Sequence, residues 1–275
     1  MTARFLGFSL MAFLLPHAGV AQRSLQLRYE APPGTVVRTA FQTNAVVWAF
    51  DGNRFESADV GTVKTTTLEG PDGMILVHLE YDSVQTRTLG SDGRWREFAV
   101  PGRDSVWTQV GLDSRMRVLS MNHGGQFTGV TSLQRILMGV PGLELPEQPV
   151  RERDGWSGAT ITSVVPGLRN ENIEPTMSGT LQAVLDSIVV RSRDTLAYVS
   201  VSGQFPAATF VEVVGPGRVT ATGDLVGSMI WSTSWDRFVS GTSRTRVWVV
   251  RQGDGQGGSG EELRIEVTTR HQVKP

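Results

Sequence analysis

The side chains that most often carry enzyme chemistry form no recognisable motif in this sequence. Cysteine is absent, which excludes a thiol nucleophile, a disulfide and lipidation at a lipobox cysteine. The Gly-x-Ser-x-Gly turn of α/β-hydrolases does not occur either. Ser259 stands between two glycines, but residues 253–260 are so rich in glycine that they predict a flexible hairpin tip.

Histidines and carboxylates give no stronger indication of chemistry. His78, His123 and His271 are far apart, and none has a second ligand at the spacing of a metal site. The acidic pairs are Glu152 with Asp154, Glu171 with Glu174, and Glu261 with Glu262. These pairs fall in expected loops or strand ends, where carboxylates normally stay in water. We therefore predict no catalytic residue, no metal and no cofactor, and we expect that the protein is not an enzyme.

Tryptophan is the most informative residue type. There are seven, and Trp231 and Trp235 stand an even number of residues apart on one expected strand, so they are predicted to face the same side. Two interpretations stay open. The aromatic side chains either fill a core, or they line an apolar groove that accepts a lipid, an acyl chain or a hydrophobic peptide. The candidate ligand-binding residues of that groove are Trp48, Phe50, Leu133, Leu137, Phe205, Phe210, Met229 and Trp231.

These residues must be positioned by β-strands, because period-two alternation rich in Val, Thr, Ile and Trp dominates the chain. Gly, Asp, Asn and Pro separate the alternating segments and predict tight turns. The expected strands are 25–29, 36–50, 57–69, 74–87, 94–100, 105–110, 115–121, 155–165, 176–190, 195–205, 209–214, 218–235, 242–251 and 262–271.

One short helix is predicted near the middle. Leu133, Ile136, Leu137 and Val140 recur at helical spacing after the capping residues at 131–132, and this helix would serve as the lid or floor of the groove. The proline-rich segment 141–149 follows and is predicted to be a linker. Residues 22–275 are thus expected to form a single β-rich domain made of two halves, 22–140 and 150–275.

Residues 1–21 are predicted to be a cleavable export signal. Arg4 precedes an apolar run over 5–15, and the small residues 18–21 suit a signal peptidase. The predicted location is therefore periplasmic or secreted. A formal net charge of −1 provides no basic field, so nucleic acid is not an expected partner.

Long meandering strands with a single helix predict an all-β fold. We expect a large, curved antiparallel sheet, a half-barrel or barrel, with the helix packed on its concave face. An outer-membrane barrel is disfavoured because three tyrosines are too few for two aromatic girdles and the chain ends in Gln272-Val273-Lys274-Pro275. No membrane span is expected after removal of the leader.

Three segments resemble a family of uncharacterised exported bacterial proteins of unknown function. They are Leu25–Tyr29 followed by 33–35, then 122–127, and 145–150 leading into 154–156. The layout also resembles the half-barrel of lipoprotein carriers of the LolA and LppX type, in which strands enclose an apolar groove. This second resemblance implies lipid or acyl-chain binding, although the chain has no lipobox cysteine and one expected helix where those carriers have several.

The expected function is therefore that of an exported, non-enzymatic protein of the bacterial envelope that binds a hydrophobic ligand, either a lipid or an acyl chain. The alternative is a structural or interaction module that binds an envelope protein and takes no small ligand. A hydrolase with an unfamiliar site is a third hypothesis, and it would need carboxylates, or a serine with His78 or His123, to converge in a cleft.

Overall fold

A computed structural model describes residues 23–98, 107–124, 143–164, 176–211, 218–252 and 261–274. Within these ranges the chain is almost entirely strand, and its one helical turn is the 3-10 segment η1, Pro71–Gly73. The predicted all-β class and large antiparallel sheet are confirmed. The predicted central helix on the concave face is wrong, because the described chain contains no α-helix. Its residues, 131–140, and those of the leader lie outside the described ranges.

The strands occupy nearly all the segments whose sequence alternates. They are β1 Ser24–Leu25, β2 Val36–Trp48, β3 Arg54–Glu69, β4 Ile75–Leu89, β5 Trp95–Phe98, β6 Trp107–Leu112, β7 Val118–Gly124, β8 Val150–Arg151, β9 Gly155–Val164, β10 Thr176–Arg191, β11 Asp194–Val211, β12 Arg218–Ser232, β13 Arg237–Gln252 and β14 Glu261–Lys274. Two expected strands, 195–205 and 209–214, merge into β11, with an irregularity in its pairing between Phe205 and Ala208.

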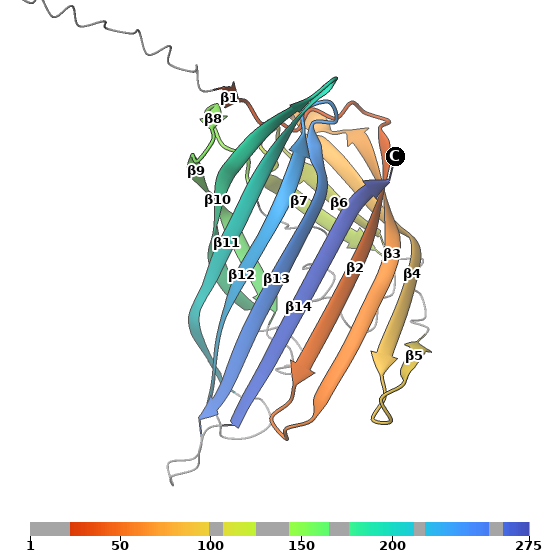
Figure 1. Cartoon of the computed structure of the whole chain (residues 1–275), viewed down its shortest axis with the longest axis vertical. Helices are drawn as coiled ribbons and strands as arrows, with labels where there is room; N and C mark the ends of the chain where they lie inside the picture. The colour runs from red at the N-terminus through yellow and green to blue at the C-terminus, as the bar shows by residue number, and fades with distance from the viewer. Residues whose placement is uncertain are drawn as a thin grey trace, which may run out of the picture.

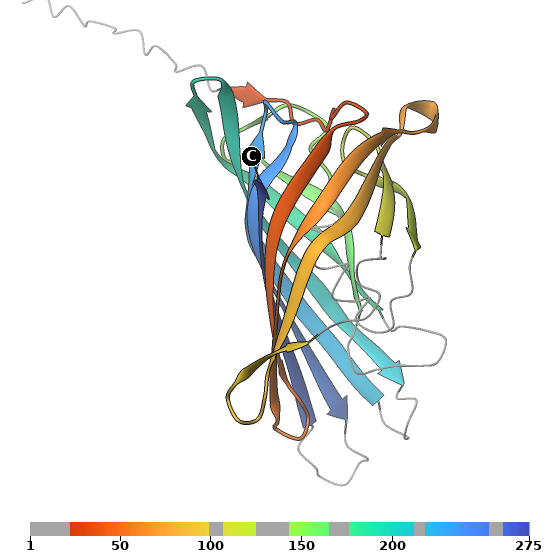
Figure 2. The same cartoon turned by 90° about the vertical axis from the view of Figure 1, so that its right-hand side faces the viewer.

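One 12-stranded sheet contains most of these strands, in the order β7-β6-β4-β3-β2-β14-β13-β12-β11-β10-β9, with β5 paired to β4. A separate two-stranded sheet joins β1 to β8. The pairing of β2 with β14 brings the first long strand beside the last, from Arg38 opposite Lys274 to Trp48 opposite Arg264. The sheet curls strongly, so that β6 and β7 lie behind β13 and β14 in Figure 1, and Figure 2 shows the same curvature from the side.

The two faces of the sheet differ sharply in chemistry. On β12, Val219, Ala221, Leu225, Met229 and Trp231 are buried on the inner, concave side. The residues between them face outward, as the strict alternation of a strand requires. The outward face carries ion pairs, among them Arg38–Asp82, Arg54–Glu56, Lys64–Glu80, Arg246–Asp224 and Arg264–Glu266. Exposed valines, such as Val36, Val60 and Val226, stand between them. Because the sheet curls, the apolar side chains of its inner face pack against one another and form the core.

Two segments without regular pairing pack into one end of the curved sheet. The side chains of Leu27, Tyr29, Leu143 and Leu145 are buried there. The amide of Tyr29 donates a hydrogen bond of 2.8 Å to the carbonyl of Ser114, and the amide of Leu145 donates one of 2.8 Å to that of Arg115. Only the first residue of the expected strand 25–29 is assigned to a strand, yet its apolar residues still face inward. The division into two halves at 141–149 stays a prediction.

Candidate ligand-binding cavity

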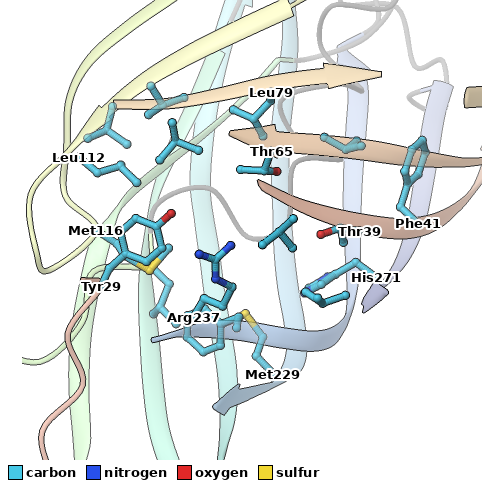
Figure 3. Close-up of a pocket in the computed structure, with 18 of the residues that line it drawn as sticks. Tyr29, Thr39, Phe41, Thr65, Leu79, Leu112, Met116, Met229, Arg237 and His271 are labelled. Carbon is cyan, nitrogen blue, oxygen red and sulfur yellow. The ribbon is translucent and has the colours of Figure 1, made fainter. Parts of the chain in front are cut away.

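A cavity of about 240 Å³ lies inside the curved sheet, near the end where these two segments pack (Figure 3). Its wall is largely apolar. The lining residues are Tyr29, Val37, Thr39, Phe41, Val63, Thr65, Val77, Leu79, Val110, Leu112, Met116, Val118, Met121, Leu143, Met229, Arg237, Phe238, His271 and Val273. They come from nearly opposite parts of the sheet, because strong curvature makes β4 and β6 face β12 and β13.

Arg237 is the charged residue among these lining side chains. It is the first residue of β13, directly after the turn that follows β12, and it is only 8% exposed. Its Nε donates a hydrogen bond of 3.1 Å to the carbonyl of Trp235. The guanidinium carbon lies 5.8 Å from the centre of the Tyr29 ring, within the range of a cation–π contact. Figure 3 shows the guanidinium directed into the space that the lining residues surround.

His271 supplies a second polar group. It lies on β14 opposite Gly241 of β13, and the ring packs so closely on that glycine that an added Cβ would sit 2.5 Å from Cε1. Burial lowers the pKa of His271 below its ordinary value of about 6.5, because the charged imidazolium loses its hydration. The imidazole is therefore neutral at pH 7. The hydroxyl groups of Thr39 and Thr65 add further neutral hydrogen-bonding groups to the wall.

The cavity reaches the surface beside the edge strand β7. Val118 and Met121 of this strand both line the cavity and are each 46% exposed. Leu119, between them, is exposed as well. Side chains that belong both to the wall and to the surface mark the side from which a ligand could enter.

The predicted groove residues do not converge. Met229 lines the cavity, and Trp231 is buried next to it, with its ring 5.0 Å from that of Phe238 at an angle of 85°. Phe205 is buried farther along the sheet, where it borders a second hollow of about 1150 Å³ lined by polar and apolar residues of β10–β13. Phe210 lies on β11, and Leu133 and Leu137 lie outside the described residues.

Trp48 and Phe50 lie elsewhere, at the other end of β2. The guanidinium groups of Arg264 and Arg54 stand 4.7 and 5.8 Å from the centre of the Trp48 ring. Arg251 stands 4.4 Å from that of Phe50. These rings cover arginine side chains and take no part in lining the cavity. The prediction that Trp231 and Trp235 face one side is wrong, because β12 ends at Ser232 and Trp235 lies in the turn, 43% exposed.

Sequence reasoning missed Arg237, His271 and Tyr29 as lining residues. The alternation in Leu25–Tyr29 indicated that Leu27 and Tyr29 share a face, and this was the one available hint. Nothing in the sequence separates Arg237 from the arginines of the outer face. Its position depends on the turn before β13 and on the packing of Tyr29 against it.

Other possible chemistry is sparse in the described part of the chain. His78 lies beside Glu80, with Nε2 and Oε1 3.3 Å apart, and its ring is 5.5 Å from that of Trp107. Among the described residues, no cluster of three or more His, Asp or Glu side chains is arranged to bind a metal. The same residues include no helix of the length and hydropathy needed to cross a bilayer.

Neither a protein family profile nor a curated protein matches the sequence. Among solved structures, the chain is similar to a loop-deletion mutant of OmpT, an outer membrane protein of Vibrio cholerae, with 9% identity and a TM-score of 0.24 over 88% of this chain and 100% of that one. An outer membrane channel from Pseudomonas putida F1 gives 9% identity and a TM-score of 0.21 over 90% and 98%. OmpT itself gives 11% and 0.19 over 88% and 100%. Scores this low carry no argument about function, and the resemblance to lipoprotein carriers stays a hypothesis.

Proposed function

We propose that this is an exported, non-enzymatic protein of the bacterial cell envelope that binds a hydrophobic ligand inside its curved sheet. The observation that carries the proposal is the apolar cavity of about 240 Å³. For comparison, an engineered apolar cavity of about 150 Å³ is enough to bind benzene. Protein interiors are closely packed, so a space of this volume inside a natural protein is normally filled by side chains.

Two further features support this function. The export signal predicted over residues 1–21 would deliver the protein to the periplasm or the cell exterior. The outward ion pairs, such as Arg246–Asp224 and Lys64–Glu80, suit a sheet face in contact with water. A sheet facing lipid would instead present an apolar band on that side.

The cavity can be tested directly with N-phenyl-1-naphthylamine, a neutral apolar dye whose fluorescence rises in apolar surroundings. Thr65→Phe, which places a ring in the cavity, is expected to abolish dye binding. Thr66→Phe is the matched control, because Thr66 is the next residue of β3 and does not line the cavity. Equal loss of binding in both variants, or no binding by the native protein, would refute the proposal.

Native mass spectrometry of protein purified gently from the envelope fraction complements this titration. A reproducible adduct of acyl-chain mass, absent from Thr65→Phe, is the expected result. A bare native mass together with an unresponsive dye would favour the second candidate function below.

The second candidate is an interaction module without a small ligand. It is favoured by one observation, namely that β7 is an edge strand among the described residues and exposes Val118, Leu119 and Met121. Exposed apolar edge strands readily pair with another chain. Leu119→Lys would then abolish binding to an envelope protein while leaving dye binding intact, since Leu119 does not line the cavity.

A further inference from the structure

The charge of Arg237 points to the chemistry of the ligand. In the described part of the chain, no carboxylate lies within salt-bridge distance of its guanidinium, and its protein contacts are the Trp235 carbonyl and the Tyr29 ring. Asp236 precedes it in sequence and interacts with it only electrostatically, without an ion pair. Arginine cannot discharge by losing a proton in a protein, so this positive charge stays in the cavity wall.

A buried charge of this kind is costly. Removing a guanidinium from water is favourable only if an anion and hydrogen bonds compensate for the lost hydration. Nε donates to the Trp235 carbonyl, whereas no acceptor among the described residues pairs with the two terminal nitrogens. Neither terminal nitrogen is a fully enclosed atom without a partner. These donors face the cavity (Figure 3). Two donors directed into the cavity suit an anion with two acceptor oxygens.

A second arginine on the same strand shows what a protein-supplied partner looks like. Arg246 of β13 faces outward and donates to both carboxylate oxygens of Asp224, from Nε at 3.0 Å and from the terminal nitrogen at 2.8 Å. This two-pronged geometry is the one that guanidinium and carboxylate groups prefer. In Arg237, Nε already donates to the Trp235 carbonyl, so the two terminal nitrogens form the pair of donors left for a carboxylate, and no Asp224 equivalent lies within the described residues.

The rest of the cavity constrains the remainder of the ligand. Leu79, Val110 and Leu112 form an apolar wall, and the half-exposed Val118 and Met121 continue it to the surface at β7. The polar groups besides Arg237 are neutral, including His271. A single buried positive charge matches a single negative charge, and the volume suits one chain better than two.

We propose that the cavity binds a single-chain amphiphile with a carboxylate headgroup, which pairs with Arg237 while its hydrocarbon tail follows the apolar wall toward β7. This inference rests on the proposed function, since it assigns the class of ligand that the same cavity takes. The two carboxylate oxygens accept from the guanidinium, so binding involves no proton transfer and no covalent step.

The test is a calorimetric titration of the native protein with decanoate and with decanol, which share a tail and differ in headgroup charge. Decanoate is expected to bind at least about tenfold more tightly than decanol, the lower bound for hydrogen bonds to a charged group. Arg237→Met should weaken decanoate binding by about 10- to 100-fold and change decanol binding by less than about threefold. Arg246→Met is the matched control and should leave both affinities unchanged.

Several outcomes would overturn the inference. Equal affinity for decanoate and decanol, or an unchanged decanoate affinity in Arg237→Met, would show that Arg237 does not select the ligand. Tighter binding of decyl phosphate than of decanoate would show that the cavity prefers a phosphate headgroup, which contradicts the inferred carboxylate. If the neutral dye binds and neither decyl compound does, the inference fails while the proposed function stands. If none of the probes binds, both fail.

A stability measurement separates a ligand-binding arginine from a structural one. Without ligand, Arg237→Met removes a largely buried charge that forms no ion pair with a described carboxylate, so its melting temperature should equal or exceed that of the native protein. With saturating decanoate, the order should reverse, because only the native protein gains from tight binding. A large loss of stability in the ligand-free variant would assign Arg237 to holding Tyr29 and the turn, and would overturn the inference.

Discussion

Two arginines of β13, one in the cavity wall and one on the outer face, have opposite surroundings. Arg246, on the outer face, forms a two-pronged pair with Asp224 of β12 and lies 5.4 Å from the centre of the Trp248 ring. Arg237, at the start of the strand, lies in the cavity wall with a carbonyl and an aromatic ring as its contacts. Asp224 pairs with the charge of Arg246, whereas no carboxylate among the described residues forms an ion pair with Arg237.

This difference indicates which polar groups serve the fold and which serve a ligand. Outward ion pairs cost little because water still solvates them, and each contributes little to stability. An inward charge without a carboxylate must be retained against a desolvation cost, so selection for function is the simplest physical reason for its presence. The predictions below test this division between the two faces.

The largest effect is expected from the tryptophans at the end of β12. Trp231→Ala should lower the free energy of unfolding by about 3–5 kcal/mol, because it empties the space where that ring meets Phe238. Trp235→Ala should change it by no more than about 0.5 kcal/mol, since Trp235 lies exposed in the turn. Chemical denaturation of both variants measures the change in the free energy of unfolding. Similar losses in the two variants would contradict the assignment of Trp231 to the inner face and Trp235 to the surface.

An intermediate effect is expected from the pH dependence of stability. The pKa of His271 is lowered by burial, so as pH falls below about 6.5 the unfolded chain takes up a proton before the folded chain does. This contribution to stability is complete above about pH 6.5 and is lost progressively below it. His271→Gln should remove that component from the melting temperature measured across this range. His78→Gln is the control, because His78 lies beside Glu80 outside the cavity. A pH profile unchanged in His271→Gln would show that the imidazole is solvated.

The smallest effect is expected on the outer face. A double-mutant cycle of Arg246→Gln and Asp224→Asn should give a coupling energy of about 1 kcal/mol or less, and it should fall as salt concentration rises. The expectation follows from the partial exposure of both side chains. A coupling of several kcal/mol that persists in high salt would mean that the outer pair is part of the core, and the contrast with Arg237 would lose its basis.

Much of the secondary structure could be predicted from the sequence. The alternation in 176–190 became β10, the turn residues around 71–73 separated β3 from β4, and the glycine-rich segment 253–260 falls between β13 and β14. Met229 and Trp231, two of the predicted groove residues, are buried on the inner face. These features are local, so the pattern of neighbouring residues is enough to specify them.

Most residues of the candidate site could not be predicted from local sequence patterns. Eight residues were predicted for the groove, and the structure places Met229 in the cavity wall while Trp48 and Phe50 stack with arginines far along β2. Aromatic residues are equally suited to a core, a groove and a cation–π contact, so residue type alone could not distinguish these roles. The expected central helix is absent from the described chain, and its residues, 131–140, lie outside the described ranges.

By itself, the sequence determined that the chain is built of long strands with one apolar and one solvated face, because side chains alternate across a strand whatever its partners. Only the tertiary structure decided which strands meet. The pairing of β2 with β14 sets Phe41 opposite His271, and the inward packing of residues 27–31 and 143–145 sets Tyr29 beside Arg237. The physical reason is that strand pairing across more than 200 residues depends on the closure of the whole sheet, with the Thr43 and Thr269 hydroxyls 3.4 Å apart at a separation of 226 residues. No local pattern carries that information, and the cavity exists only where those distant strands curve toward one another.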